Sequence, residues 1–327
     1  MIITRTPVRI PIGGGGTDLP SYYSKYEGFL VTAAIDKYTY LTVDKRFEST
    51  SRLTYSKMEM VDKISEIKHP IIREACDMLN IEMGIEIHSL ANIPSSVGLG
   101  TSSSFTVGLL HALHIYKRDY VSLKTLAEEA CSIEIDRLGE PIGKQDQYIA
   151  AFGGIICMEI DKNGEVTITP LKVSNDIIEE LESNILLFYT GIRRNASIVL
   201  KEQKEKEDKD DKTVIGAMHE IKDIGKEIKL HIEKGNLSEF GSLLDKHWNV
   251  KKRLSKKVSN EEIDKWYEIA KMNGALGGKI MGAGGGGFFM FYCESNKQAL
   301  RKAMKGEGLR EVRFRFDFEG TKTIGHF

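Results

Sequence analysis

The segment from Asn92 to Leu113, NIPSSVGLGTSSSFTVGLLHAL, combines residue types that could bind phosphate. Its glycines allow the backbone to approach a ligand closely, and the apolar stretch after them predicts a helix that begins near Ser102. The N–H groups and the positive dipole end of such a helix favour an anion. A Ser or Thr N-cap on an ordinary core helix is the alternative. Hydroxyl groups that could donate to phosphate oxygens, or bind a hard cation such as Mg²⁺, occupy Thr101, Ser102, Ser103 and Ser104.

Two other segments are rich in glycine. RIPIGGGGTDLPSYY begins at Arg9, and four consecutive glycines would be costly in conformational entropy if they only made a turn. We predict that this loop lies against a polyhydroxy substrate, with Asp18 accepting hydrogen bonds from hydroxyls; a flexible loop in which Asp18 caps a turn is the alternative. The segment GGKIMGAGGGGFF, residues 277–289, predicts a close approach of the backbone to a neighbour. No GxxxxGK[ST] motif occurs, and GAGGGG leads into a strand pattern, which argues against Walker-type and Rossmann sites.

Two carboxylates could take part in phosphoryl transfer. In an expected helix over 122–138, Glu134 falls within about 20° of Leu123, on the apolar stripe. A buried carboxylate is expensive unless it is paired, for example with Arg137, or binds a cation. Asp146 stands beside Lys144 where a short helix begins, so it could stabilise the helix N-terminus or orient a hydroxyl that attacks phosphorus.

The elements that must position these residues alternate between strands and helices. Strand patterns cover 29–47 and 85–90, and Asn163-Gly164 between apolar runs predicts a hairpin. The pattern of apolar and polar residues changes near residue 185. There, a short buried strand pattern precedes helices expected over 213–234, 236–256 and 260–273. We therefore predict two domains, 1–184 and 185–327.

The composition excludes several classes of protein. A net charge of −1 argues against a general nucleic-acid binder, and the longest apolar runs, ILLFY and FFMFYC, are too short to span a membrane. We see no signal-peptide pattern at the N-terminus, and the four cysteines form no CxxC pair, which favours a reduced cytoplasmic setting without structural zinc. We expect small-molecule partners, no nucleic acid and no membrane, and leave open a homodimer.

The three glycine-rich segments, in this order, resemble the signature segments of the GHMP kinase superfamily, which is named after galactokinase, homoserine kinase, mevalonate kinase and phosphomevalonate kinase. PSSVGLGTSSSF corresponds to the family pattern P-x-x-x-G-L-G-S-S-A, with Thr101 where the family usually has Ser. The resemblance covers essentially the whole chain. It implies an α+β fold of two lobes, the first like domain 2 of ribosomal protein S5 and the second ferredoxin-like, with the active site between them.

The resemblance also implies roles for individual residues. Asp146 would be the catalytic base and Arg9 its basic partner, while Ser102 and Glu134 would bind Mg²⁺. The interval from Glu134 to Asp146 is one residue longer than the mevalonate kinase pattern. The residues that would wrap the phosphates of ATP are Pro94, Ser96, Gly98, Gly100, Thr101, Ser102, Ser103 and Ser104.

Three stretches, RIPIGGGGTDLPSYY, GEPIGKQDQYIAAFGG and TGIRRNAS, most resemble the branch that phosphorylates D-glycero-D-manno-heptose 7-phosphate. The implied reaction is transfer of the γ-phosphoryl group of ATP to the anomeric hydroxyl, which gives the 1,7-bisphosphate for nucleotide-activated heptose. A kinase for a non-phosphorylated sugar such as fucose, or a non-catalytic sugar and ATP sensor, are the alternatives. Implied substrate contacts are Gly15, Gly16, Thr17, Asp18, Gly284 and Gly285. Candidates for a basic subsite that holds the phosphate already on the sugar are Lys144, Arg193 and Arg194.

Overall fold

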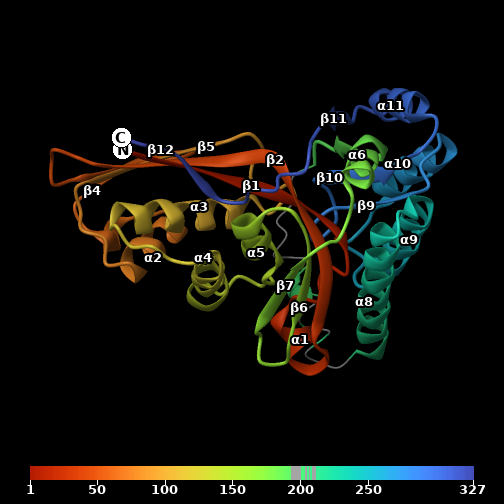
Figure 1. Ribbon diagram of the computed structural model, residues 1–327, viewed down its shortest axis with the longest axis horizontal. Helices are drawn as coiled ribbons and strands as arrows, with labels where there is room; N and C mark the ends of the chain where they lie inside the picture. Colours follow the sequence, from red (N-terminus) through yellow and green to blue (C-terminus); the bar gives the residue numbers. More distant parts are fainter. Residues whose placement is uncertain (193–199, 203–204, 206, 208–210) are drawn as a thin grey trace.

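A computed structural model describes residues 1–192, 200–202, 205, 207 and 211–327 of the chain. The fold is mixed α+β and contains two sheets (Figure 1). The first sheet has the order β12-β1-β2-β5-β3-β4, with β6 paired to β2 and β7 paired to β6. Its strands are β1 (Ile2–Gly13), β2 (Gly28–Lys45), β3 (Ser51–Thr54), β4 (Met58–Val61), β5 (Ile85–Ala91), β6 (Ile155–Ile160), β7 (Val166–Pro170) and β12 (Lys322–His326).

Helices cover one face of the first sheet, and their apolar side chains meet those of the strands in a common core (Figure 1). Leu110 in the helix that begins at Thr101, for example, is fully buried in the same cluster as Leu41 and Val43 of β2. The Ser122 hydroxyl accepts a hydrogen bond from the Thr125 N–H at 3.0 Å and so caps the helix that begins at Leu123. The helices are α2 (Pro70–Met78), α3 (Thr101–Tyr116), α4 (Leu123–Cys131) with a π-helical continuation (Ser132–Arg137), and α5 (Gln145–Phe152); α1 (Pro20–Tyr26) links β1 to β2, and a short 3-10 turn covers Ile64–Glu66.

The second sheet has the order β11-β8-β10-β9, and all of its pairs are antiparallel. In chain order this is 4-1-3-2, the arrangement of a ferredoxin-like fold, as expected. Its strands are β8 (Ile185–Tyr189), β9 (Gly277–Ile280), β10 (Phe288–Tyr292) and β11 (Arg310–Val312), and its helices are α8 (Lys212–Glu233), α9 (Leu237–Lys251), α10 (Glu261–Met272) and α11 (Lys297–Gly306); α6 (Asn175–Asn184) leads into β8.

The last strand does not stay with the second sheet. β12 returns to the first sheet and pairs with β1, so that the chain ends lie side by side, with the Met1 N–H₃⁺ group 2.9 Å from the Phe327 carbonyl oxygen (Figure 1). The second sheet begins at Ile185, next to the expected boundary. The division into 1–184 and 185–327 stays a prediction, and the last strand is an exception to it.

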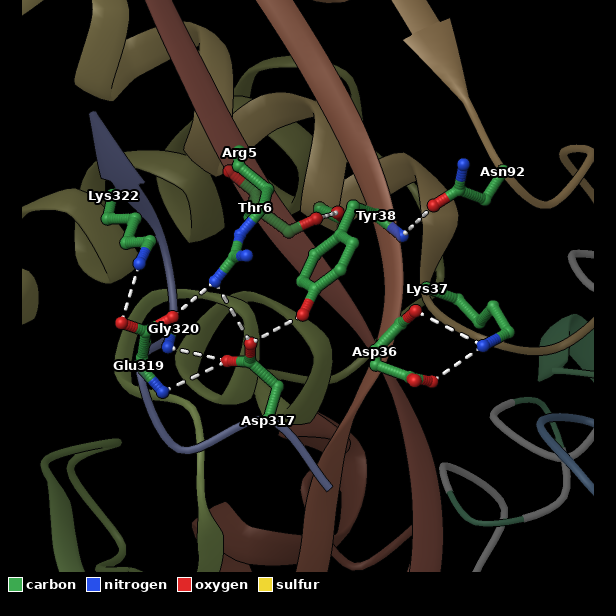
Figure 2. Close-up of polar contacts among 11 residues, drawn as sticks. Arg5, Thr6, Asp36, Lys37, Tyr38, Asn92, Asp317, Glu319, Gly320 and Lys322 are labelled. Atoms are coloured by element: carbon green, nitrogen blue, oxygen red, sulfur yellow. Dashed lines mark hydrogen bonds and ion pairs between the residues drawn. The ribbon is translucent and has the colours of Figure 1, made fainter. Parts of the chain in front are cut away.

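A polar network fixes the segment that leads into β12 (Figure 2). The buried Asp317 carboxylate accepts a hydrogen bond from the Tyr38 hydroxyl at 2.9 Å and pairs with Arg5 of β1 at 3.4 Å. Its other oxygen accepts from the backbone N–H groups of Glu319 and Gly320. One carboxylate therefore joins β1, β2 and the C-terminal segment.

Candidate active site

The phosphate-loop candidate connects β5 to α3, as the sequence predicts. Gly98 and Gly100 have φ values of +80° and +73°, which side chains with a Cβ rarely adopt. A Cβ on Gly98 would lie 2.6 Å from the Met281 carbonyl oxygen, so glycine is also required for space. Gly100 precedes the first residue of α3 and has no side chain to cap it, which leaves the first N–H groups of this helix available to a ligand.

The hydroxyl groups of this segment have different surroundings. Ser102 is exposed, and its hydroxyl donates to the Glu134 carboxylate at 2.7 Å. Ser104 is fully buried and donates to the Thr6 carbonyl at 2.9 Å, so it anchors α3 to β1. Pro94 and Ser96 are exposed at the start of the loop. The predicted ATP-binding residues therefore include exposed side chains, such as Ser102, and buried side chains that stabilise the fold, such as Ser104.

Glu134 is buried, with an exposed fraction of 2%, and its second oxygen accepts from Gln147 Nε2 at 2.8 Å. In the described part of the chain no Lys or Arg pairs with it; Arg137, the alternative partner, pairs with Glu74 and Asp77. Burial, opposed by hydrogen bonds from hydroxyls, raises the pKa of Glu134 to about 7.

A π-helical turn over 132–137 carries Glu134. The Leu138 N–H bonds to the Ile133 carbonyl, five residues back, at 3.0 Å, and such a turn holds about one residue more than an α-helical turn. The extra residue between Glu134 and Asp146 fits this turn. The predicted burial of Glu134 is confirmed, but the reason given for it is wrong, because Leu123 is 37% exposed and an unbroken α-helix does not connect the two residues.

Arg9 and Asp146 form a two-pronged ion pair at the start of α5. Arg9 Nε donates to Asp146 Oδ1 and its terminal nitrogen to Oδ2, both at 2.8 Å, and the guanidinium also donates to the Gly98 carbonyl at 2.6 Å. Arg9 is buried, with an exposed fraction of 6%. A Cβ on Gly100 would lie 3.0 Å from Asp146 Oδ2. The carboxylate is thus oriented rigidly, beside the N-terminus of α3.

The first glycine loop follows β1. Asp18 accepts from the backbone N–H groups of Gly16 and Gln145, each at 3.0 Å, and burial raises the pKa of this carboxyl, with a smaller effect of Asp146. Gly15, Gly16 and Asp18 line a cavity that also contains Arg9 and Asp146.

Thr17, a predicted substrate contact, has a structural position instead. Its side chain is fully buried, and its hydroxyl oxygen lies 2.8 Å from the carbonyl oxygens of both Gly14 and Phe29, which share its single hydrogen, and accepts from the Phe29 N–H at 3.1 Å. Because these bonds use the hydroxyl, Thr17 holds the glycine loop against β2 and does not line the cavity.

The third glycine segment touches the phosphate loop. A Cβ on Gly282 would lie 2.8 Å from the Gly98 Cα, and Gly282 lines the cavity. Gly284 and Gly285, the predicted contacts, do not line it; they pack on Val258, whose carbonyl accepts from the Gly285 N–H at 2.8 Å. The close backbone approach is confirmed, and the residue that reaches the cavity is Gly282.

The predicted basic subsite is not formed by the described residues proposed for it. Lys144 donates to the Gly164 carbonyl at 2.7 Å and to the Glu128 carboxylate at 3.3 Å, so its charge is already compensated away from the cavity. Arg193 and Arg194 lie outside the described residues.

The cavity has basic and amide side chains that sequence reasoning missed, namely Gln145, His247, Lys251 and Lys279. One signal could have found two of them: His247 and Lys251 continue the buried stripe of α9 that contains Phe240 and Leu244. Gln145 Nε2 is buried without a hydrogen-bond partner among the described residues. The first lobe therefore contributes Asp146 to the cavity wall, and the second lobe contributes His247, Lys251 and Lys279.

Comparison with known proteins identifies the family. The model of the GHMP kinases N terminal domain matches residues 67–154, and that of the GHMP kinases C terminal domain matches residues 228–308. A D-glycero-alpha-D-manno-heptose 7-phosphate kinase from Campylobacter jejuni is 34% identical over 98% of this chain and 98% of its own. The chain belongs to the GHMP kinase family. It is an ATP-dependent phosphotransferase with an alcohol group as acceptor.

Solved structures agree with this GHMP kinase assignment. A D-glycero-D-manno-heptose 1-phosphate kinase from Bacteroides thetaiotaomicron has a TM-score of 0.84 and 26% identity, with all of both chains covered. The galactokinase of Lactococcus lactis has a TM-score of 0.78 at 20% identity, over 98% of this chain and 94% of that one, and shows the shared fold. In the described residues no helix is long and apolar enough to cross a membrane.

Proposed function

We propose that this GHMP kinase transfers the γ-phosphoryl group of ATP to the anomeric hydroxyl of D-glycero-D-manno-heptose 7-phosphate and forms the 1,7-bisphosphate. The observation that carries the proposal is the Asp146 carboxylate, fixed by Arg9 at 2.8 Å beside the N-terminus of α3 and facing a cavity between two glycine segments. The choice of sugar rests on the 34% identical relative, which has this heptose phosphate in its name.

The side chains of this protein would act mainly by positioning. Asp146 orients the attacking hydroxyl and accepts its proton, while the N–H groups at the start of α3 hold the phosphates. Asp18 supplies an acceptor for sugar hydroxyls, and Gln145 Nε2, which has no hydrogen-bond partner among the described residues, supplies a donor.

Magnesium enters the proposal through Ser102 and Glu134. A buried carboxylate without a basic partner in the described chain, bonded to an exposed hydroxyl at 2.7 Å, offers the oxygen ligands that Mg²⁺ prefers. Few protein ligands suffice, because Mg²⁺ usually keeps waters and phosphate oxygens in its shell. When bound with ATP, the ion neutralises phosphate charge. We place the reaction in the cytoplasm, which suits four free, buried cysteines.

The test is ADP release with Mg·ATP and a panel of acceptors: D-glycero-D-manno-heptose 7-phosphate, sedoheptulose 7-phosphate, mannose 6-phosphate, fucose, galactose and mevalonate. We expect activity with the aldoheptose phosphate alone. Asp146→Asn should lower kcat by about 10²- to 10⁴-fold and leave ATP binding intact, since the proton acceptor is lost. Activity on a free sugar would keep the kinase but change the assigned substrate. No activity on any acceptor would favour a non-catalytic sugar and ATP sensor.

A further inference from the structure

Three cationic or imidazole side chains of the second lobe form part of the wall of the cavity that Asp146 also lines. His247 and Lys251 come from α9, and Lys279 comes from β9. Within the described residues none of the three pairs with a carboxylate. A wall that gathers such groups in the interior of a protein is costly unless an anion occupies it.

Lys279 and His247 are more than nine-tenths buried, with exposed fractions of 1% and 2%. The Lys279 ammonium donates to the Ile12 carbonyl of β1 at 2.9 Å. Its other two N–H groups have no hydrogen-bond acceptor identified among the described residues. Both ring nitrogens of His247 are buried without a hydrogen-bond partner in the described chain. Buried polar atoms of this kind are rare in folded proteins and point to a ligand that completes the site.

Lys251 connects this wall to the phosphate loop through Gly282. Its ammonium donates to the carbonyls of Ile280, at 3.1 Å, and Gly282, at 2.5 Å. Gly282 in turn packs directly on Gly98. The Lys251 charge therefore lies at the junction where the second lobe meets the loop that holds the phosphates of ATP.

The electrostatics of the cavity support the same conclusion. Burial, together with the Arg9 charge, lowers the pKa of Lys251 to about 7, and burial lowers the pKa of Lys279 and of His247 as well. Among the described residues, the other titratable groups that line the cavity are Arg9, Asp18 and Asp146. A bound phosphate would restore the charge of Lys251, because an anion favours its ammonium form.

We propose that Lys251, with His247 and Lys279 behind it, forms a phosphate-binding subsite on the second-lobe wall of the cavity. Two phosphates have this chemistry. One is the phosphate that the acceptor sugar already carries, an assignment that rests on the proposed function. The other is the γ-phosphoryl group during its transfer toward the hydroxyl beside Asp146.

Three variants test the subsite: Lys251→Met, which removes the charge; Lys251→Arg, which keeps it; and Lys246→Met, a matched control on the exposed face of α9. Kinetics at saturating Mg·ATP compare the heptose 7-phosphate with the unphosphorylated heptose as acceptors. If the subsite holds the sugar phosphate, Lys251→Met raises KM for the phosphorylated acceptor by about 10- to 100-fold and leaves KM for the free heptose unchanged. If it holds the transferred group, kcat falls by a similar factor with both acceptors.

Binding of inorganic phosphate, measured by calorimetry, tests the subsite without any assumption about the acceptor. We expect the wild type, Lys251→Arg and Lys246→Met to bind phosphate, and Lys251→Met to bind it about 10- to 100-fold more weakly. The wild type should also take up protons on binding at pH 8, seen as a dependence of the enthalpy on the buffer. Equal phosphate binding and equal kinetics in Lys251→Met and the wild type would overturn the proposal. An inactive wild type that still binds phosphate through Lys251 would reject only the proposed reaction.

Discussion

Glu134 shows what a single buried carboxyl group can do to the stability of this protein. Hydrogen bonds from Ser102 and Gln147 hold it, and its pKa is raised to about 7. An acid with a raised pKa binds more protons in the folded than in the unfolded state between about pH 4.5 and 7. Its contribution to the free energy of unfolding therefore falls as the pH rises through this window, by up to about 3 kcal/mol.

From this we predict that Glu134→Gln is more stable than the wild type at pH 8 in EDTA and about equally stable at pH 4.5. Urea unfolding at the two pH values measures the difference. Mg²⁺ and ATP should bind the wild type more tightly than the variant. At saturating concentrations they should therefore narrow the difference between the two free energies of unfolding at pH 8. A variant that is less stable than the wild type at pH 8 in EDTA would instead indicate a structural ion pair.

The candidate site was predictable from the sequence only in part, and the missing residues share a physical reason. Asp146, Arg9, Ser102 and Glu134 occupy short motifs, and the structure brings them together around the loop. Lys251, in contrast, belongs to a long helix outside any short motif, and its one local signal is its position on the buried stripe of α9. Its place on the cavity wall depends on how the second lobe packs on the first.

At the scale of elements, the connection between β5 and α3 depends on backbone conformations that glycine alone adopts at low cost. Gly98 has φ +80° and lies against the Met281 carbonyl, while Gly139, after the π-helical turn, has φ +66° and open space around it. The two positions therefore separate the conformational cost of a side chain from its steric cost.

We predict that Gly139→Ala lowers stability by about 1 kcal/mol, the cost of a left-handed residue with a Cβ, without a change in kinetics. Gly98→Ala should lower the stability by more than this. It should also lower kcat/KM for ATP by about 100-fold, because the loop must shift to relieve the 2.6 Å contact. Thermal unfolding and steady-state kinetics of both variants provide the comparison. Wild-type kinetics in Gly98→Ala would contradict the assignment of this loop to phosphate binding.

The elements themselves follow local patterns closely. The strand expected over 29–47 is β2, Gly28–Lys45, and the helix expected over 213–234 is α8, Lys212–Glu233. The π-helical turn was not predicted, because a period of 3.6 residues was assumed for the whole of 122–138. Nor was the return of β12 to the first sheet, because local periodicity does not specify the partner of a strand.

At the scale of the molecule, Asp317 connects the segment before β12 to both β1 and β2 (Figure 2). We predict that Asp317→Ala lowers the free energy of unfolding by about 3 to 5 kcal/mol, because it removes the acceptor of the Tyr38 hydroxyl and of two N–H groups and one of the carboxylates that pair with Arg5. Glu319→Ala is the matched control: its exposed carboxylate pairs with the same Arg5, so its loss should cost less than about 1 kcal/mol. Equal effects of the two substitutions in denaturant unfolding would contradict this role of Asp317.

The pairing of β12 with β1 also leaves the two ends of the chain next to each other, 2.9 Å apart between Met1 N and the Phe327 oxygen. A short peptide linker could join them, and new ends could be opened between the exposed residues Lys162 and Asn163, in the turn that joins β6 to β7. Such a circular permutant would keep every contact of the cavity, because neither the linker nor the cut touches it. The order in which the strands are synthesised is therefore separable from the site that they build.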